Sequence, residues 1–369
     1  MRIGIILHGP EIVDEGEAKR IIGILGTEHD IIAKLGGTMG RTAVLDAGLE
    51  DVIDISMGLT PSETINALKE SIDLAVLLNH GKNLETGRHF GGMVASRLDS
   101  SIPFIHIERP FYDGRIIYYS ANGKHCAQYI RELLKKHDKD HELIVEHGKP
   151  SPMILRSEGG SLIRRISGAI PGENIRLEGI VIGHITHPEP EIVCMDGRVI
   201  ELRGVKVKQH GLTKLNMRKI DLYNAKVKTG NIRRTKHSAK IKPSLSLSSG
   251  KSIVIIDHCA ESTFELVKDA DIAITVGDDT TTIAADILSR LGIPVIGITD
   301  GDLDCILGDT IVPTGSVIIR VKEGFDDIMG KEVFEKVMRS SQTNNLPGDE
   351  LLAAILSLAK KYLVAVKYY

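Results

Sequence analysis

Short aliphatic runs alternate with segments of helical spacing at both ends of this chain, over the first 140 residues and again from residue 251 onward. Parallel strands that are buried on both faces give such uninterrupted aliphatic runs, and the helices between them return the chain across the sheet. The sequence has no tryptophan and only six phenylalanines, so Ile, Val, Leu and Ala must form the cores. The alternation predicts an α/β protein in which two parallel-sheet, Rossmann-like domains flank a smaller β-rich domain.

The first α/β domain is expected over residues 1–147 and the second over residues 250–369. In the first, the predicted strands are Arg2–Leu7, Asp30–Leu35, Val52–Ile55, Leu74–Leu78 and Pro103–Ile107, and the predicted helices are Asp14–Leu25, Pro61–Ser71, Glu85–Leu98 and Gly123–His137. In the second, the predicted strands are Ser252–Ile256, Asp271–Val276, Pro294–Ile298 and Ser316–Val321, and the predicted helices are Ser262–Asp269, Thr280–Leu291, Gly330–Ser340 and Asp349–Leu363. Thr60 with Glu63 three residues later is typical of a capping box.

Between these regions, residues 148–243 are expected to form the β-rich domain. Short strand-like runs are punctuated here by glycine and proline, and no segment shows a convincing helical pattern. The pair Asp196-Gly197 stands between two such runs and predicts a hairpin turn. The sequence PSLSLSSG at residues 243–250 predicts a linker to the last domain.

The composition also limits the classes of protein to which the chain can belong. Its four cysteines are far apart and form no CxxC pair, so neither a zinc site nor a disulfide framework is expected. No apolar run reaches the roughly 20 residues of a membrane helix. The chain begins directly with a strand pattern, so we expect a cytoplasmic protein without a membrane partner.

Carboxylates follow three consecutive strands of the last domain. The first strand is followed by Asp257, the second by Asp279, and the third by Asp300 and Asp302. Ligands of parallel sheets bind at the carboxyl ends of the strands, and clustered carboxylates attract Mg²⁺. We therefore predict that Asp279, Asp300 and Asp302 bind Mg²⁺, that Asp279 is catalytic, and that Asp257 is an outer ligand or a base.

The residues Gly277, Thr280, Thr281 and Thr282 surround the expected start of the helix after the second strand. Free N–H groups, hydroxyls and the positive end of the helix dipole favour phosphate at such a position. These residues are predicted to bind the phosphate of a nucleotide cofactor or phosphorylated ligand. The alternative is that Asp279 or Thr280 only caps the helix.

The run from Asp269 to Cys305 resembles the nucleotide-binding motif of the NAD kinase and diacylglycerol kinase group. Gly277 matches the first glycine of that motif, Asp279 the essential aspartate and Thr281 the threonine. The following strand is matched by Pro294, Gly297 and Ile298. The resemblance covers about a tenth of the chain and implies ATP use.

Two features differ from that group. Asp278 and Thr280 stand where the group has glycines that let phosphate approach the backbone, and the β-rich segment precedes the motif. These differences favour a protein that binds a nucleotide without turnover, as a sensor or carrier.

The same acidic edge is also similar to the Toprim pattern of topoisomerases and primases. The pair Asp300-x-Asp302 matches the later part of that pattern, and Asp257 or Glu261 would take the place of its first acid. This resemblance implies Mg²⁺ that acts on nucleic-acid phosphates.

Polar loops follow the strands of the first domain as well. The loop Gly36-Gly37-Thr38-Met39-Gly40-Arg41 precedes a helix, and its N–H groups could wrap an anion. We predict that Gly36, Gly37, Thr38, Arg41 and Lys82 contribute to cofactor binding. A tight strand-to-helix turn is the alternative.

The histidines and carboxylates at the other strand ends allow more than one interpretation. His8 follows the first strand, Asn79-His80-Gly81-Lys82 the fourth, and Glu108-Arg109 the fifth. His8 and His80 are candidates for general bases, metal ligands or ordinary surface residues.

The segment from Glu201 to Lys242 is strongly basic, with only Glu201 and Asp221 as acids. Such a segment attracts nucleic acid, a polyphosphate or an acidic partner. Tyr223 is its one aromatic residue, so binding of single strands by base stacking is not favoured.

The segments HGPEIVDEGEAKRI, LGGTMGRTAVLDAGLE, NHGK and VGDDTTTIAADI resemble an uncharacterised archaeal protein family found in methanogens. The resemblance spans nearly the full chain and implies a cytoplasmic archaeal protein, but no activity.

The leading hypothesis is a Mg²⁺-dependent protein that binds a nucleotide or phosphometabolite, with phosphotransfer as the enzymatic form. The alternatives are a non-catalytic nucleotide sensor or carrier and a Toprim-like nucleic-acid-binding protein. Whether the chain is an enzyme, and its oligomeric state, are left open by the sequence.

Overall fold

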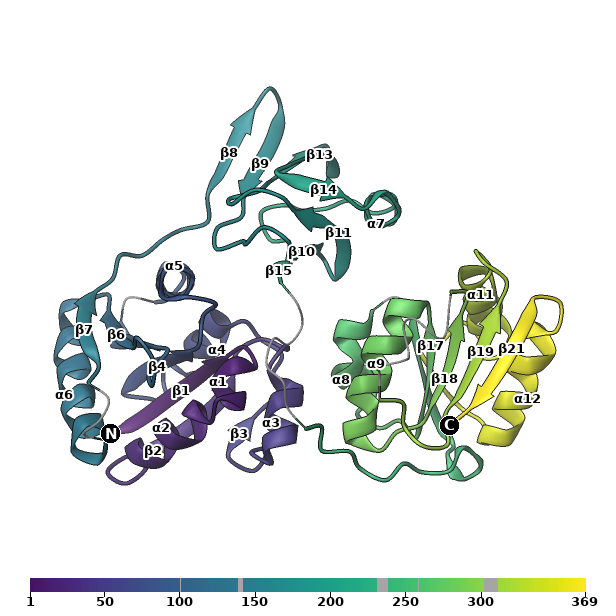
Figure 1. Ribbon diagram of the computed structural model, residues 1–369, viewed down its shortest axis with the longest axis horizontal. Helices are drawn as coiled ribbons and strands as arrows, with labels where there is room; N and C mark the ends of the chain where they lie inside the picture. The colour runs from purple at the N-terminus through teal and green to yellow at the C-terminus, as the bar shows by residue number, and fades with distance from the viewer. Residues whose placement is uncertain (100, 139–141, 231–237, 258, 302–310) are drawn as a thin grey trace. The chain divides into compact units, whose positions relative to one another are not determined.

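The computed structural model describes residues 1–99, 101–138, 142–230, 238–257, 259–301 and 311–369. The chain is of mixed α/β type, with parallel strand pairs near both ends and antiparallel sheets between them. Two compact units are present, Met1–His237 and Ser238–Tyr369, and each is described by itself (Figure 1). The β-rich segment shares the first unit with the N-terminal sheet.

The N-terminal sheet has seven strands in the order β3-β2-β1-β4-β5-β6-β7. Their bounds are β1 (Arg2–His8), β2 (Asp30–Leu35), β3 (Ile53–Asp54), β4 (Leu74–Asn79), β5 (Phe104–Glu108), β6 (Arg115–Tyr118) and β7 (Ile144–His147). All neighbouring pairs are parallel except β5 and β6. The five predicted strands are confirmed, whereas β6 and β7 were not predicted.

Helices cover both faces of this sheet. They are α1 (Glu11–Asp14), α2 (Glu17–Leu25), α3 (Arg41–Ala47), α4 (Pro61–Leu68), α5 (Leu84–Ala95) and α6 (Ala121–His137). One aliphatic core joins the sheet to α1, α2, α3 and α6, and a second joins it to α4 and α5. The capping box of Thr60 and Glu63 is confirmed. The single helix predicted from Asp14 is wrong at its start, because Gly16 at φ 74° separates two helices.

The β-rich segment forms two antiparallel four-stranded sheets, β14-β11-β10-β15 and β13-β12-β9-β8. The strands are β8 (Leu155–Glu158), β9 (Ser161–Arg165), β10 (Asn174–Leu177), β11 (Ile180–Ile185), β12 (Glu191–Met195), β13 (Arg198–Arg203), β14 (Val205–Val207) and β15 (Val227–Thr229). The hairpin at Asp196-Gly197 is confirmed, with φ values of 51° and 78°. The expectation of no helix is wrong, because α7 (Gln209–Leu215) packs against β11.

The second unit contains a six-stranded sheet in the order β20-β16-β17-β18-β19-β21. Its strands are β16 (Ser252–Asp257), β17 (Ile272–Val276), β18 (Val295–Thr299), β19 (Val317–Val321), β20 (Thr343–Asn345) and β21 (Leu363–Tyr368). The four central strands are parallel, and the two edge strands run antiparallel to their neighbours. These edge strands were not predicted.

The helices of this unit also form cores on both faces of its sheet. They are α8 (Thr263–Leu266), α9 (Asp278–Leu291), α11 (Asp326–Lys336) and α12 (Gly348–Ala359), with short 3-10 turns at Leu247–Ser249 and Ala260–Ser262. The expected linker at residues 243–250 includes the first of these turns. Throughout the described residues, helices fall short of the length and apolarity that crossing a bilayer requires.

Candidate functional site

A cavity of about 280 Å³ opens where the strand order of the N-terminal sheet reverses, and we call it the β1/β4 cleft. From β1 the chain builds outward through β2 and β3 on one side, then returns to place β4 on the other. Doubly wound sheets bind ligands at such points, beyond the carboxyl ends of the strands. His8 and Asn79, the last residues of β1 and β4, are paired in register and both line the cleft.

The lining of the β1/β4 cleft is cationic. Its basic side chains come from both parts of the first unit and are Lys82, Arg97, Arg164, Arg165 and Lys228, whereas Glu11 is its one acidic residue among those described. An excess of positive charge in a recess attracts anions and raises their local concentration. The lining therefore favours a negatively charged ligand.

Some of these cations already have partners. The Lys82 ammonium forms an ion pair with Glu173 of the β-rich segment and lies 3.3 Å from the carbonyl oxygen of Gly168. Arg165 lies within 3.7 Å of Glu189 and 3.5 Å of Glu191. These pairs neutralise part of the charge, and the pair of Lys82 and Glu173 also joins the β-rich segment to the N-terminal sheet.

Arg97 and Arg164 differ from the other basic residues. Arg164 Nη1 donates to the carbonyl oxygens of Leu222, at 3.1 Å, and Ala225, at 2.6 Å. Within the described part of the chain, neither guanidinium forms an ion pair with a carboxylate. Burial lowers the pKa of Arg164 to about 10, and the positive charge of Arg97 acts in the same direction. Two such like charges at one cavity are stabilised when an anion lies between them.

Apolar side chains form the remaining walls of the cleft. They include Met39, Phe90, Met93, Met153, Ile154 and Ile166. The rings of His8 and Phe90 stack with centroids 3.9 Å apart and planes inclined by 20°. Ligand pockets usually combine such apolar walls with a few polar groups and enclose about 300–1,000 Å³. At about 280 Å³ the cleft lies just below that range, which favours a compact ligand.

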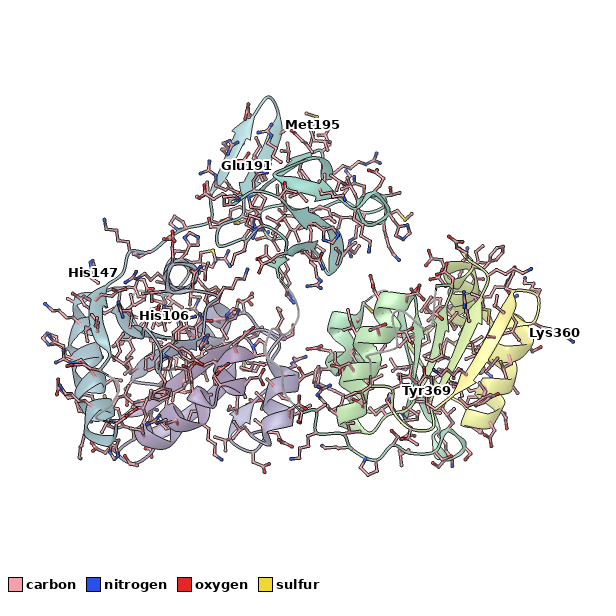
Figure 2. All side chains as sticks on the ribbon, viewed as in Figure 1. His106, His147, Glu191, Met195, Lys360 and Tyr369 are labelled. Carbon is pink, nitrogen blue, oxygen red and sulfur yellow. The ribbon has the colours of Figure 1, made fainter. Side chains whose placement is uncertain are left out.

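A buried polar network lies directly behind His8. His8 Nδ1 is 2.9 Å from Asn79 Oδ1, and Asn79 Nδ2 donates to Glu108 Oε2 at 2.6 Å. Glu108 Oε2 is also 2.9 Å from His106 Nε2, and Glu108 Oε1 accepts from the Gly81 N–H at 2.6 Å. His106 and Glu108 have no exposed surface, and Figure 2 labels His106 within the first α/β region. Because Glu108 ends β5 in register with Asn79, three adjacent strand ends contribute to one network.

Two glycines of α5 allow the helix to approach this network. A Cβ atom on Gly87 would lie 2.1 Å from Glu108 Cδ, and one on Gly91 would lie 2.1 Å from His106 Nδ1. The spacing of four residues places both glycines on the same face of α5. Glycine at these two positions therefore leaves room for the buried pair of His106 and Glu108.

A second network extends from the cleft along α2. His80, which lines the cleft, has its Nδ1 atom 2.7 Å from Oε2 of the buried Glu17. Arg109 lies 3.4 Å from His80 Nε2 and donates to the carbonyl oxygen of Gly81 at 2.9 Å. Arg109 has a φ of 49°, a conformation that costs a non-glycine residue about 1–3 kcal/mol and is concentrated at functional sites.

The predicted binding residues of the first domain fall into two groups. Lys82 lines the cleft, whereas the N–H groups of Gly36 and Gly37 donate to the carbonyl oxygens of Leu7 and Leu59. These two donors are therefore engaged within the protein, as in the alternative of a tight strand-to-helix turn.

Thr38 and Arg41 belong to the same loop. Thr38 Oγ1 accepts a hydrogen bond of 3.4 Å from Lys228, a residue of the cleft lining. Arg41 is 1% exposed, and its Nε donates to the carbonyl oxygen of Ile55. A role in cofactor binding stays a prediction for all of these loop residues.

At the acidic edge of the second unit, Asp278 lies beside Asp300. Burial, and also the charges of Asp300 and Asp326, raise the pKa of Asp278. Asp278 Oδ1 accepts from the Gly301 N–H at 3.3 Å. The neighbouring Asp279, which was predicted as a metal ligand, is exposed. The helix α9 begins at Asp278, two residues earlier than predicted, and Asp278 rather than Asp279 lies beside Asp300.

The other predicted residues of this edge are less closely connected. Asp257 ends β16 and is exposed, and Asp302 lies outside the described residues. Where the structure describes the chain, it places no group of three or more His, Cys, Asp or Glu side chains so that they could hold a metal. Binding of Mg²⁺ by Asp279, Asp300 and Asp302, and the role of Asp257, stay predictions.

The three threonines after Gly277 are largely buried at the start of α9. Thr281 is fully buried, and its Oγ1 is 2.8 Å from Oγ1 of the equally buried Thr275. Thr280 is 5% exposed, and Thr282 has a buried hydroxyl that makes no hydrogen bond to the described residues. The position of Thr281 supports a structural role for its hydroxyl.

A double-mutant cycle checks this role of Thr281. Thr281→Val leaves the Thr275 hydroxyl buried without its partner, so it is expected to lower the free energy of unfolding by about 1–2 kcal/mol. Thr275→Val should have a similar effect, and the double variant should be less destabilised than the sum of the two. Additive effects in urea unfolding would show that the two hydroxyls do not interact.

Most of the polar network behind the cleft was not predicted from the sequence. His8, Asn79 and Glu108 stand directly after predicted strands. His8 was left open as a base, a metal ligand or a surface residue, and Asn79 and Glu108 were given no role. His106 lies inside an aliphatic strand, where a histidine in the pattern FIHIE is the signal that could have drawn attention to it. Arg97 and Arg164 follow no predicted strand and come together through tertiary packing.

Comparisons with known proteins add a family but no activity. A family model described as "Uncharacterized protein conserved in archaea (DUF2117)" matches residues 5–341. The protein named "Uncharacterized protein MJ0065" from Methanocaldococcus jannaschii is 39% identical over 339 residues, which cover 91% of each chain. The crystal structure of L-asparaginase I from Vibrio cholerae is 11% identical over 96% of each chain, but its TM-score of 0.19 supports no conclusion. On the extent of the first two matches, the chain belongs to this archaeal family, DUF2117.

Proposed function

We propose that this protein binds a small phosphorylated metabolite in the β1/β4 cleft. The observation that carries the proposal is the pair of arginines, Arg97 and Arg164, which line the cleft without carboxylate partners among the described residues. Arginine donates several fixed hydrogen bonds that fit phosphate oxygens, and it stays charged at neutral pH. A phosphate group between these residues would relieve their mutual repulsion.

The position of the cleft adds support from the sheet. Parallel sheets of Rossmann-like domains bind nucleotides and phosphometabolites beyond the strand ends where the order reverses. We propose that the N-terminal sheet is used in the same way and that the β-rich segment closes the site with Arg164 and Lys228. The apolar walls would hold the uncharged part of the ligand.

The geometry of this cleft does not bear on several parts of the hypothesis formed from the sequence. Dependence on Mg²⁺, phosphotransfer and nucleotide binding at the acidic edge all stay predictions, as do the Toprim-like alternative and the cytoplasmic location. A sensor or carrier would need only the binding step, so it is compatible with the cleft as proposed.

A thermal-shift screen of the full chain tests the proposal. The probes are inorganic phosphate, pyrophosphate, AMP and ATP, each with and without Mg²⁺, with malonate as an anion that lacks phosphorus. We expect at least one phosphate compound to raise the Tm. Because a charge-assisted hydrogen bond contributes about 1.5–3 kcal/mol, Arg164→Met should weaken binding by about tenfold or more.

Three variants make the result specific to the cleft. Arg198→Met removes an exposed arginine of the same β-rich segment and should bind as the wild type does. Asp279→Ala and Asp300→Ala test the acidic edge of the second unit. The proposal fails if Arg164→Met keeps wild-type affinity while either aspartate variant loses binding.

A further inference from the structure

We infer that His8 is the proton acceptor of the β1/β4 cleft, with Nε2 as the accepting atom and Asn79 as the residue that positions the ring. The inference deepens the proposed function, since it rests on a ligand binding in this cleft. It adds an activity to the binding site: removal of a proton from the bound ligand, or from a water molecule beside it.

The hydrogen bonds behind His8 determine which ring nitrogen carries the proton. A carboxylate only accepts hydrogen bonds, so the group of Asn79 that faces Glu108 must be its amide NH₂. The Asn79 carbonyl oxygen then faces His8 Nδ1 at 2.9 Å and can only accept. His8 Nδ1 must therefore carry the proton, and in the neutral ring Nε2 has a free lone pair.

The Asn79 amide is itself held firmly. It is 4% exposed, and Glu108, its partner, also accepts from the Gly81 N–H at 2.6 Å. A rotation of the amide by 180° would place its carbonyl oxygen against the Glu108 carboxylate and its NH₂ against the imidazole. That arrangement would place two acceptors in contact, so the network has one favourable orientation.

The Nε2 atom of His8 remains free for a ligand. It makes no hydrogen bond to the described residues, and the ring lines the cleft with one face against Phe90. Its partner at Nδ1 fixes the direction in which Nε2 points. A base needs this combination of fixed orientation and access to the ligand.

The surroundings keep the ring neutral at pH 7. Burial lowers the pKa of His8 from its usual 6.5 and is the largest influence, and the charge of His106 acts in the same direction. The Asn79 hydrogen bond and the charges of Glu11 and Glu108 act in the opposite direction. The net lowering leaves the Nε2 lone pair unprotonated in neutral solution.

The proposed step is a simple proton transfer. The bond between the proton and a ligand or water atom breaks, its electron pair stays on that atom, and a new N–H bond forms at His8 Nε2. The resulting imidazolium still donates through Nδ1 to Asn79. The negative charges of Glu11 and Glu108 favour it, and Arg97 and Arg164 favour the negative charge formed on the ligand.

NMR of the full chain with ¹⁵N-labelled histidine tests the inference without a ligand. Two-bond ¹H–¹⁵N spectra distinguish the two neutral tautomers, and His8→Gln assigns the signals. At pH 7 we expect neutral His8 with the proton on Nδ1, and a titration midpoint below 6.5. A proton on Nε2, or a protonated ring at pH 7, would overturn the inference.

Asn79→Leu separates positioning from a purely structural role. It removes the acceptor at Nδ1, so His8 is expected to change to a mixture of both tautomers, whereas the exposed His187 should keep its spectrum. An unchanged His8 tautomer in this variant would refute the positioning role. If the variant does not fold, the wild-type spectrum alone still decides the tautomer. These spectra are recorded without ligand, so a failed thermal-shift screen would count against the proposed function and not against the state of His8.

Discussion

Glu108→Leu is expected to lower the free energy of unfolding by about 3–5 kcal/mol, the range found when one partner of a buried charged network is removed. Glu108 is fully buried and accepts from Asn79 and the Gly81 N–H, with His106 Nε2 at 2.9 Å. Leucine offers no acceptor, so the donors around it would be buried without a partner. Urea unfolding followed by circular dichroism measures the change.

The matched control is Glu132→Leu. The Glu132 side chain is 62% exposed and pairs only with the neighbouring Arg131 among the described residues. Exposed ion pairs of this kind contribute about 0–1 kcal/mol. If the two variants unfold at similar urea concentrations, Glu108 does not stabilise the strand ends as described.

Gly91→Ala is expected to destabilise the protein by about 3 kcal/mol, at the upper end of the usual cost of overpacking. The new methyl group would lie 2.1 Å from His106 Nδ1 and 2.6 Å from the Tyr119 hydroxyl. His106 is fully buried and cannot move aside without disturbing Glu108. The variant should also loosen the ring stack of His8 and Phe90, because α5 carries Phe90.

Gly23→Ala is a control that should stabilise the protein, whereas Gly91→Ala should destabilise it. Gly23 lies within α2, it is exposed, and a Cβ atom there would meet nothing within 4 Å. Alanine in a helix should stabilise the protein by about 0.5–1 kcal/mol relative to glycine. Stabilisation by both substitutions would mean that α5 does not pack closely on His106. Thermal unfolding of the two variants provides the comparison.

The sequence was most informative about the central parallel strands. Most of them, for example Leu74–Asn79, are aliphatic runs buried on both faces, so their pattern is strong and local. The edge strands β7, β20 and β21, and β6 next to β7, escaped prediction because their position depends on pairing with distant neighbours. Leu363, the first residue of β21, was predicted as the end of a helix, yet this strand pairs antiparallel with β19.

The cleft could be predicted only in part for a similar reason. Reading the residues after each strand led to His8, His80 and Lys82, because the carboxyl ends of parallel strands are local features of the sequence. Arg97 and Arg164 are far apart in sequence and come together only when the β-rich segment packs on α5. A contact of this kind leaves no periodic pattern in the sequence.

A crystal structure of the full chain with AMP and MgCl₂ is the most direct test of the central claim. The account predicts that the phosphate lies in the β1/β4 cleft, within hydrogen-bond distance of Arg97 and Arg164, with His8 facing the ligand. A phosphate bound at the start of α9 beside Asp278 and Asp300, with no ligand in the cleft, would contradict it.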